Sequence, residues 1–236
     1  MSQNPPLGPV LHQFTQADQM AQAVAQTVAE HLQVALRQRA RATLVVSGGK
    51  TPVSVWQVLR KVDLPWGRVD ITLADERWVP LTHPDSNEAL VRQHLLTDRA
   101  AQACWWPLYD PSLDLDVSAQ RRGHELRQQL HWPADVVMLG MGQDGHTASW
   151  FPGQAMPSDD RWCMSVPCPA LPNVQQPRVS LTPRALLDAA CVVLVAQGQD
   201  KEATLGQAML PGSALPVSLA LWQAAHGCEV FFSPGQ

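Results

Sequence analysis

An aspartate and a histidine stand two residues apart in a glycine-rich segment of this chain, at Asp144 and His146. The segment follows residues 136–139 (VVML), an apolar run that is typical of a buried strand. Histidine is the side chain best suited to move a proton near neutral pH. Because open α/β sheets bind ligands at the carboxyl ends of their strands, this arrangement predicts an acid–base centre in the loop.

The glycines of this loop also imitate the dinucleotide-binding fingerprint Gly-x-Gly-x-x-Gly, at residues 140–145. That fingerprint requires a helix that starts on its glycines and an acidic residue at the end of the next strand. Here residues 150–153 (WFPG) end any helix almost as it begins, and Asp159 and Asp160 lie in a proline-rich stretch with no strand before them. The sequence therefore disfavours a dinucleotide site.

A second glycine loop, residues 47–52 (SGGKTP), separates a predicted strand at 43–46 from a predicted helix that starts near residue 53. It is not a nucleoside-triphosphate loop, since Leu44 stands where that motif needs a glycine. Consecutive small residues before a helix can still expose backbone N–H groups that bind an anion. An ordinary strand-to-helix turn is the alternative interpretation.

Charged and polar residues follow a third predicted strand, residues 69–74. The triplet Asp75-Glu76-Arg77 comes first, and Asn87 follows at short range. A charged triplet on a surface turn is usually solvated. Its place at the carboxyl end of a strand favours an arginine that faces a ligand.

Two of the three lysines in the chain, Lys50 and Lys201, stand at strand-to-helix turns. The second follows residues 191–196, a near-continuous apolar run expected of a strand that is covered on both faces. Lysines that served only solubility would be scattered. Together with Arg178, in the segment 178–182 (RVSLT), they favour a local anion-binding cluster.

Taken in order, these segments resemble the glucosamine/galactosamine-6-phosphate isomerase family, from about residue 44 to residue 201. The matching motifs are SGGxTP at 47–52, DER at 75–77, SN at 86–87, GxGxDGHTASxFP at 140–152, RVSLT at 178–182 and GxxK at 198–201. Lys50 departs from the small hydroxyl residue that the family often carries there. Whether the loop binds phosphate through its backbone alone or adds a charge therefore stays open.

The resemblance implies the lactone-hydrolysing branch of this family. The deaminase branch carries Asn-Glu where this chain has Trp150-Phe151, and Asp-Glu-Tyr in place of the triplet that ends in Arg77. The expected reaction is hydrolysis of 6-phospho-D-glucono-1,5-lactone to 6-phospho-D-gluconate by a carboxylic ester hydrolase of the oxidative pentose phosphate pathway. The alternatives are an amino-sugar-phosphate isomerase/deaminase and a non-catalytic sugar-phosphate sensor on the same fold. Asp144 with His146 favours catalysis.

The resemblance also implies roles for individual residues. His146 would act as the general base on a water molecule and return the proton to the departing ring oxygen. Asp144 would orient the imidazole, with a structural turn as the alternative role. The expected substrate- and phosphate-binding residues are Ser47, Gly48, Gly49, Lys50, Thr51, Asp75, Arg77, Asn87, Gly145, Arg178 and Lys201. Arg77, Arg178 and Lys201 would hold the phosphate with the 47–51 loop. This mechanism requires no redox cofactor and no metal.

The composition agrees with a metabolic enzyme, since 45% of the 236 residues are hydrophobic, 16% are charged, and the formal net charge is −4. The expected partner is a phosphorylated sugar lactone, with neither nucleic acid nor membrane, and the chain is expected to be a monomer or a small homo-oligomer. Five cysteines without paired metal-ligand spacing indicate reduced thiols in the cytoplasm. Residues 1–10 contain no Lys, no Arg and no long apolar run, which argues against a signal peptide or membrane span.

Strand-like and helix-like segments alternate along the chain, with helices predicted at residues 17–38, 88–96 and 118–130. This alternation predicts an α/β fold: a Rossmann-like, open, mainly parallel sheet with helices on both faces. We expect one domain over residues 1–236, in which 1–9 form a flexible leader. The proline-rich stretch 152–177 is expected to form one wall of the site. Most of the tryptophans are expected to pack in the core or at its rim, and Trp150, which adjoins the histidine loop, is the exception to test.

Overall fold

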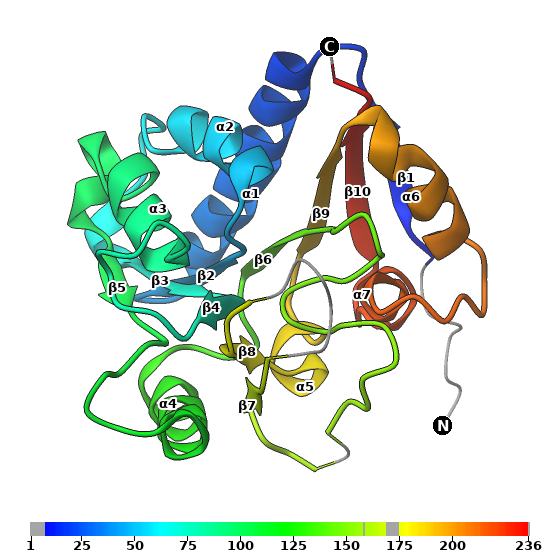
Figure 1. The fold of residues 1–236 in the computed structure, drawn as a ribbon. Coiled ribbons are helices and arrows are strands. Elements are labelled where there is room, and N and C mark those ends of the chain that lie inside the picture. The colour runs from blue at the N-terminus through cyan, green and yellow to red at the C-terminus, as the bar shows by residue number, and fades with distance from the viewer. Residues whose placement is uncertain (1–7, 158, 169–174, 236) are drawn as a thin grey trace, which may run out of the picture.

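Seven strands, all parallel, form the central sheet of this computed structural model, which describes residues 8–157, 159–168 and 175–235 (Figure 1). Their order across the sheet is β1-β10-β9-β6-β2-β3-β5. The strands are β1 (Val10–Gln13), β2 (Ala42–Val46), β3 (Val69–Leu73), β5 (Cys104–Trp106), β6 (Val136–Gly140), β9 (Val192–Gln197) and β10 (Cys228–Ser233). Every residue of β2 and β3 is buried, and so are the residues of β9 up to Ala196, as the apolar run at 191–196 predicted for a strand covered on both faces.

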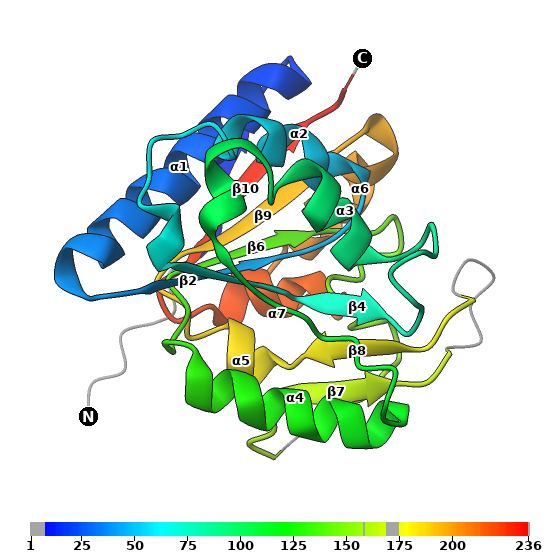
Figure 2. The ribbon, with the colours of Figure 1, turned by 90° about the vertical axis from the view of Figure 1, so that its left-hand side faces the viewer.

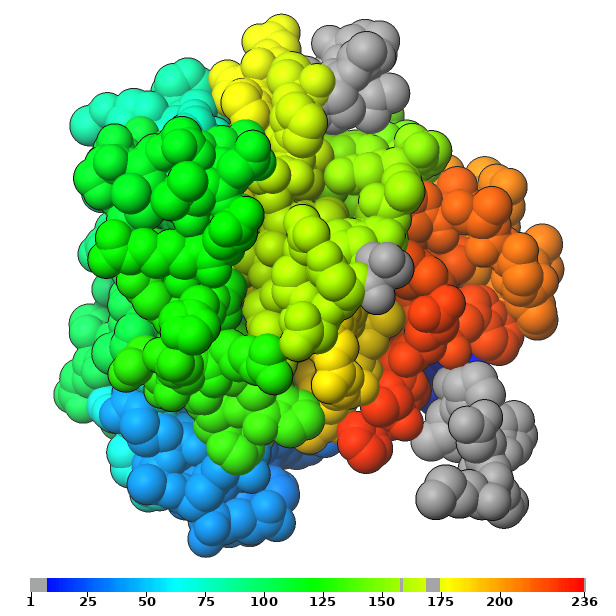
Figure 3. Space-filling model, turned by 90° about the horizontal axis from the view of Figure 1, so that it is seen from below, coloured from blue at the N-terminus to red at the C-terminus, as the bar shows by residue number. Residues whose placement is uncertain are grey.

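Helices cover both faces of this sheet, which confirms the predicted fold class. The helices are α1 (Ala17–Gln38), α2 (Lys50–Leu59), α3 (Asn87–His94), α4 (Leu115–Gln129), α5 (Pro183–Leu186), α6 (Glu202–Ala208) and α7 (Val217–Gln223). Figure 2 shows α1 and α2 on one side of the sheet and α5, α7 and α4 on the other. From below, α4, the segment around β7 and α7 lie side by side (Figure 3). None of the helices in the described ranges is long and apolar enough to cross a membrane.

The three predicted helices are confirmed. Two of them begin earlier than predicted, at residues that follow a capping side chain. The helix at 17–38 has the predicted bounds. Helix α3 begins one residue early because the Oγ of Ser86 accepts the N–H of Ala89, at 3.1 Å. Helix α4 begins three residues early because Asp114 accepts the N–H of Val117, at 2.9 Å. Side-chain caps of this kind satisfy N–H groups that have no partner within the helix.

A second, smaller sheet of three antiparallel strands was not expected from the sequence. It pairs β4 (Asp75–Arg77) with β8 (Arg178–Leu181), and β8 with β7 (Cys163–Val166). The charged triplet is therefore a strand of its own, and Arg77 lies directly opposite Arg178 in the register. Two motifs that are far apart in the sequence are joined by backbone pairing, which fixes their side chains on neighbouring strands.

The prediction that the proline-rich stretch 152–177 forms one wall of the site stays a prediction: Gln175 and Gln176 line a small pocket together with Arg77 and Arg178. The described part of this stretch contributes β7 to the smaller sheet, and none of its described residues lines the main pocket. Residues 158 and 169–174 of this stretch lie outside the described ranges, as do residues 1–7 of the expected leader.

Trp150 belongs to the core, although it stands beside the histidine loop. Its side chain is fully buried, and its Nε1–H donates to the carbonyl oxygen of Leu181 at 2.9 Å. That bond ties the loop after β6 to the end of β8. The tryptophan next to the predicted acid–base centre therefore supports the fold, as most of the tryptophans were expected to do.

Candidate active site

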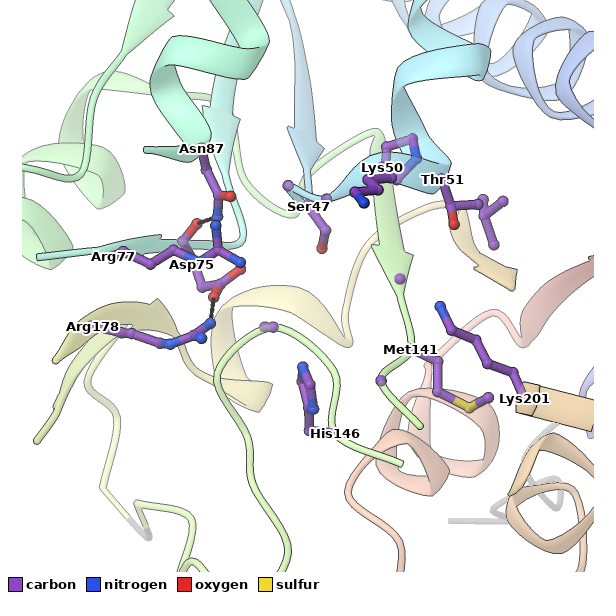
Figure 4. A pocket seen from close by; sticks show the side chains of 17 residues that line it. Ser47, Lys50, Thr51, Asp75, Arg77, Asn87, Met141, His146, Arg178 and Lys201 are labelled. Carbon is purple, nitrogen blue, oxygen red and sulfur yellow. Dashed lines mark hydrogen bonds and ion pairs between the residues drawn. The ribbon is translucent and has the colours of Figure 1, made fainter. Parts of the chain in front are cut away.

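A pocket opens where the loops after β2, β6 and β9 meet (Figure 4). These three strands are neighbours in the sheet, so their carboxyl ends lie at the same edge. The residues that line the pocket are Ser47, Gly48, Gly49, Lys50, Thr51, Pro52, Asp75, Arg77, Asn87, Gly140, Met141, Gly142, His146, Ala148, Arg178, Val195 and Lys201. The structure thus brings together all the predicted site residues except Asp144 and Gly145, which lie in the same loop as His146 but do not line the pocket.

His146 and Asp144 form a hydrogen-bonded pair. The Nδ1 of the imidazole lies 2.6 Å from Oδ1 of Asp144, and the backbone N–H of His146 donates to the same oxygen at 3.1 Å. The hydrogen bond from His146 is the main reason that the pKa of Asp144 is lowered. Asp144 therefore closes a turn and holds the ring at once, so its two predicted roles are compatible. With Nδ1 engaged, Nε2 is the nitrogen left to exchange a proton.

Gly142 makes room for the imidazole, and sequence analysis overlooked this role. A Cβ on Gly142 would lie 2.2 Å from two atoms of the His146 ring and 2.7 Å from the Asp144 carboxylate. Gly145 has a φ of +79°, a conformation that favours glycine. The glycines that imitate a dinucleotide fingerprint therefore allow the backbone conformation and the close packing of this loop. The sequence does not show that Gly142 is the glycine that the histidine needs, because this follows from how the His146 ring packs in three dimensions.

The start of α2 presents hydrogen-bond donors to the pocket. Gly49 precedes the helix with a φ of 107°, no side chain caps it, and the first turn holds no acidic residue. The first N–H groups of a helix have no partner within it and attract anions. Ser47 is buried, and its Oγ has no hydrogen-bond partner among the described residues. The loop predicted to bind an anion thus has free donors where an anion would lie.

A buried ion pair joins Asp75 to Arg178, at 3.3 Å. Burial lowers the pKa of Arg178, and the charge of Asp75 opposes this shift. Asn87 donates from Nδ2 to the backbone carbonyl of Asp75 at 2.8 Å. Asp75, which was predicted to bind substrate, lines the pocket, and its carboxylate also contacts protein groups. Its negative charge compensates part of the positive charge on this side of the pocket.

The middle residue of the charged triplet, Glu76, holds the start of α3. Its carboxylate accepts the backbone N–H groups of Arg77, Asn87 and Glu88 at 2.7, 2.8 and 2.7 Å. Burial raises the pKa of Glu76 to about 7, while these three donors favour the charged form. Glu76 therefore fixes the backbone of two predicted site residues without lining the pocket itself. The sequence does not reveal this role of Glu76, because a buried carboxylate cannot be told from a solvated one by its neighbours in the chain.

Lys201 reaches the pocket from the short turn Gln199–Lys201 that precedes α6. Burial lowers the pKa of Lys201, and the neighbouring Asp200 opposes the shift. Asp200 is itself hydrogen-bonded to Gln143 of the histidine loop. Figure 4 shows Lys50, Thr51 and Lys201 on one side of the pocket and Arg77, Arg178, Asp75 and Asn87 on the other, with Ser47 and His146 between them.

The described residues contain no group of three or more His, Cys, Asp or Glu side chains that could hold a metal ion. The polar groups of the pocket instead comprise an Asp-supported histidine, cationic side chains and backbone donors. This is the composition of a site that binds a small anionic molecule and transfers a proton.

Comparison with known proteins assigns the family. The family model described as glucosamine-6-phosphate isomerases/6-phosphogluconolactonase matches residues 15–229, and the chain belongs to this family. A 6-phosphogluconolactonase of Pseudomonas aeruginosa is 44% identical over 211 residues, covering 86% of this chain and 87% of that protein. One of Mesorhizobium japonicum is 37% identical, with 94% of each chain covered. A crystal structure of a 6-phosphogluconolactonase from Shewanella baltica superposes with a TM-score of 0.89 at 34% identity, covering 98% of this chain and all of that one.

The close packing of Gly142 against His146 yields a stability prediction. Gly142→Ala should lower the free energy of unfolding by about 1–3 kcal/mol, the range for overpacking, because the new methyl group and the ring compete for one space. The loss should be smaller in a His146→Ala background, where the ring is gone. Urea unfolding of the single and double variants measures the stability loss caused by Gly142→Ala with and without the His146 ring.

Gly206→Ala is the matched control, since a Cβ at Gly206 in α6 meets no atom within 4 Å. It should not destabilise the protein. An equal loss for Gly142→Ala with and without the His146 ring would show that the glycine is needed for another reason.

Proposed function

We propose that this chain hydrolyses 6-phospho-D-glucono-1,5-lactone to 6-phospho-D-gluconate, the lactone-opening step of the oxidative pentose phosphate pathway. The observation that carries the proposal is that an Asp144-supported His146 opens into the same pocket as the cationic groups and the start of α2. Hydrolysis of a phosphorylated lactone needs a base that activates the attacking water and a binding site for the phosphate dianion. The naming of the relatives as 6-phosphogluconolactonases supports the same substrate.

In the proposed mechanism, Nε2 of His146 removes a proton from a water molecule as that water attacks the lactone carbonyl. The hydrogen bond at Nδ1 lets the Asp144 carboxylate stabilise the imidazolium that forms. The tetrahedral intermediate then collapses, and the imidazolium gives its proton to the departing ring oxygen. One water molecule is added across the C–O bond, and the histidine ends the cycle as it began.

We assign the phosphate to the side of the pocket formed by Lys50, Thr51 and Lys201. The first turn of α2 contributes backbone donors there and contains no acidic residue. On the other side, the buried carboxylate of Asp75 would repel a dianion and already compensates Arg178. Arg178 and Arg77 are then placed to stabilise the oxygen of the lactone carbonyl as it gains negative charge. Arg77, Arg178 and Lys201 were all predicted from the sequence to hold the phosphate. In this proposal Lys201 binds the phosphate, and the two arginines lie at the lactone end of the pocket.

An assay of the purified protein tests the reaction. We expect rapid hydrolysis of freshly generated 6-phosphogluconolactone, unchanged activity in EDTA, and no release of ammonia from glucosamine 6-phosphate. Ammonia release at a comparable rate would favour the isomerase/deaminase alternative. Binding of sugar phosphates without turnover of either substrate would favour the sensor. Activity that is lost in chelator and restored by one metal would overturn the mechanism given above.

Substitution of the histidine tests the base. His146→Ala should lower kcat by about 10²–10⁴-fold, the usual contribution of a positioned acid–base group, and should leave 6-phosphogluconate binding largely intact. Asp144→Asn should lower kcat by less, because the ring keeps its place but loses the charge that supports the imidazolium. Turnover near that of the wild type in His146→Ala would exclude His146 as the base.

Comparison of two substrates tests the assignment of the phosphate. Lys201→Ala should lower kcat/KM for the phosphorylated lactone by about ten- to a hundredfold, equivalent to about 1.5–3 kcal/mol for a hydrogen bond to a charged group. Hydrolysis of unphosphorylated gluconolactone, which lacks that contact, should change much less. Arg178→Ala should instead affect both lactones. If Arg178→Ala lowered kcat/KM for the phosphorylated lactone only, the phosphate would have to bind on the side of Arg77 and Arg178.

We further propose that the enzyme acts in the cytoplasm, on a free phosphorylated sugar lactone, as a monomer or small homo-oligomer, with residues 1–236 as a single domain. The buried, raised-pKa thiols of Cys163, Cys191 and Cys228 support a protein whose cysteines stay reduced.

A further inference from the structure

Arg178 is held in the pocket from two directions by groups outside its own strand. One nitrogen of its guanidinium lies 3.3 Å from Oδ2 of Asp75, and Cζ lies 5.3 Å from the centre of the Phe151 ring. Arg178 and Phe151 are both buried. Within the described residues, Nε of Arg178 has no hydrogen-bond partner. The guanidinium is therefore held by the protein at the wall of the pocket, and its contact with Asp75 uses only Nη1.

The Asp75 carboxylate depends in turn on Ser149. The Oγ of Ser149 donates to Oδ2 of Asp75 at 2.6 Å, to the same oxygen that Arg178 contacts. Ser149 is fully buried and does not line the pocket. Its backbone N–H donates to Oγ of Ser180 on β8, at 3.3 Å. Its hydroxyl thus bonds to the Asp75 carboxylate from within the protein and not from the pocket.

The contact between Asp75 and Arg178 is the longer of the two bonds to this oxygen, so it does not by itself fix the carboxylate. A buried carboxylate needs several donors to offset its loss of hydration. The shorter bond from Ser149 supplies one and sets the rotation of the carboxylate about its side-chain bonds. Without it, Asp75 is free to turn, and Arg178 loses the partner that directs its guanidinium.

We propose that Ser149 is a positioning residue, which sets the Asp75 carboxylate and through it the direction in which Arg178 presents its guanidinium to the substrate. Phe151 completes the arrangement, since its ring also lies 4.9 Å from that of His146. The short segment from Ser149 to Phe151 therefore contacts both His146 and the ion pair of Asp75 with Arg178, although Arg178 belongs to the smaller sheet. This inference rests on the proposed function, because Arg178 is assigned there to the lactone end of the pocket.

The test is a double-mutant cycle in kcat/KM for 6-phosphogluconolactone. Ser149→Ala should lower kcat/KM by about five- to tenfold, the scale of one hydrogen bond to a charged group acting through a second residue. In an Arg178→Ala background, Ser149→Ala should have almost no further effect, because the group that it positions is absent. A merely structural serine would lower activity by the same factor in both backgrounds.

Ser218→Ala is the matched control: Ser218 is buried in α7, its Oγ donates to the carbonyl of Ala208 at 3.0 Å, and it does not line the pocket. It should leave kcat/KM unchanged. Should Ser149→Ala fail to fold, Ser149→Cys keeps nearly the same volume with a weaker donor, and the same cycle applies. Equal losses in both backgrounds, or no loss in the wild-type background, would overturn the inference. A wild-type protein that does not hydrolyse the lactone would overturn the proposed function instead.

Discussion

The ion pair between Asp75 and Arg178 is the interaction on which the polarity of the pocket depends. Two charges are withdrawn from water there, which is unfavourable unless other groups satisfy them. The hydroxyl of Ser149 bonds to the Asp75 carboxylate, and the ring of Phe151 covers the guanidinium. Because one carboxylate is committed to this pair, one side of the pocket is partly neutral and the other keeps its positive charge. A substrate with a dianion at one end and a polarisable carbonyl at the other matches this division.

The two sheets have distinct tasks in building this site. The parallel sheet brings the loops after β2, β6 and β9 to one edge, where they supply the helix start, the histidine and Lys201. The small antiparallel sheet brings Arg77 and Arg178 opposite each other on β4 and β8. The segment after His146 links the two, through Ser149 to Asp75 and through Trp150 to Leu181. Shifts in the loop after β6 would therefore move groups at both ends of the pocket.

The centre of the parallel sheet could be predicted from the sequence because its signals are local. The strands β2, β6 and β9 are mainly apolar runs, and each is followed by a loop with a recognisable set of polar residues. The small sheet could not, since β4 and β7 have only three and four residues and carry mixed polarity, and since β4 pairs with β8, which is distant in the sequence. The role of the proline-rich stretch 152–177 at the site stays a prediction, because residues 158 and 169–174 lie outside the described ranges.

The residues that share the pocket could be predicted where residue type points to chemistry, as for His146, Arg178 and Lys201, and their roles stay predictions. Supporting groups escaped prediction, because their roles follow from tertiary contacts. Gly142 was interpreted as part of a dinucleotide imitation, and Glu76 as solvated charge; the first makes room for a ring, and the second caps a helix. Ser149 has no signal in the sequence that separates it from other buried serines.

Gly48 and Asn87 come from two different motifs and share one space. A Cβ on Gly48 would lie 1.9 Å from Oδ1 of Asn87, and the asparagine is held in place by its bond to the Asp75 carbonyl. Gly48 has no unusual φ, so a neighbouring side chain and not its backbone forbids a larger residue. A side chain at residue 48 therefore requires the Asn87 side chain to move and give up its bond to the Asp75 carbonyl, or a smaller residue at position 87, so substitutions at these two positions should be coupled.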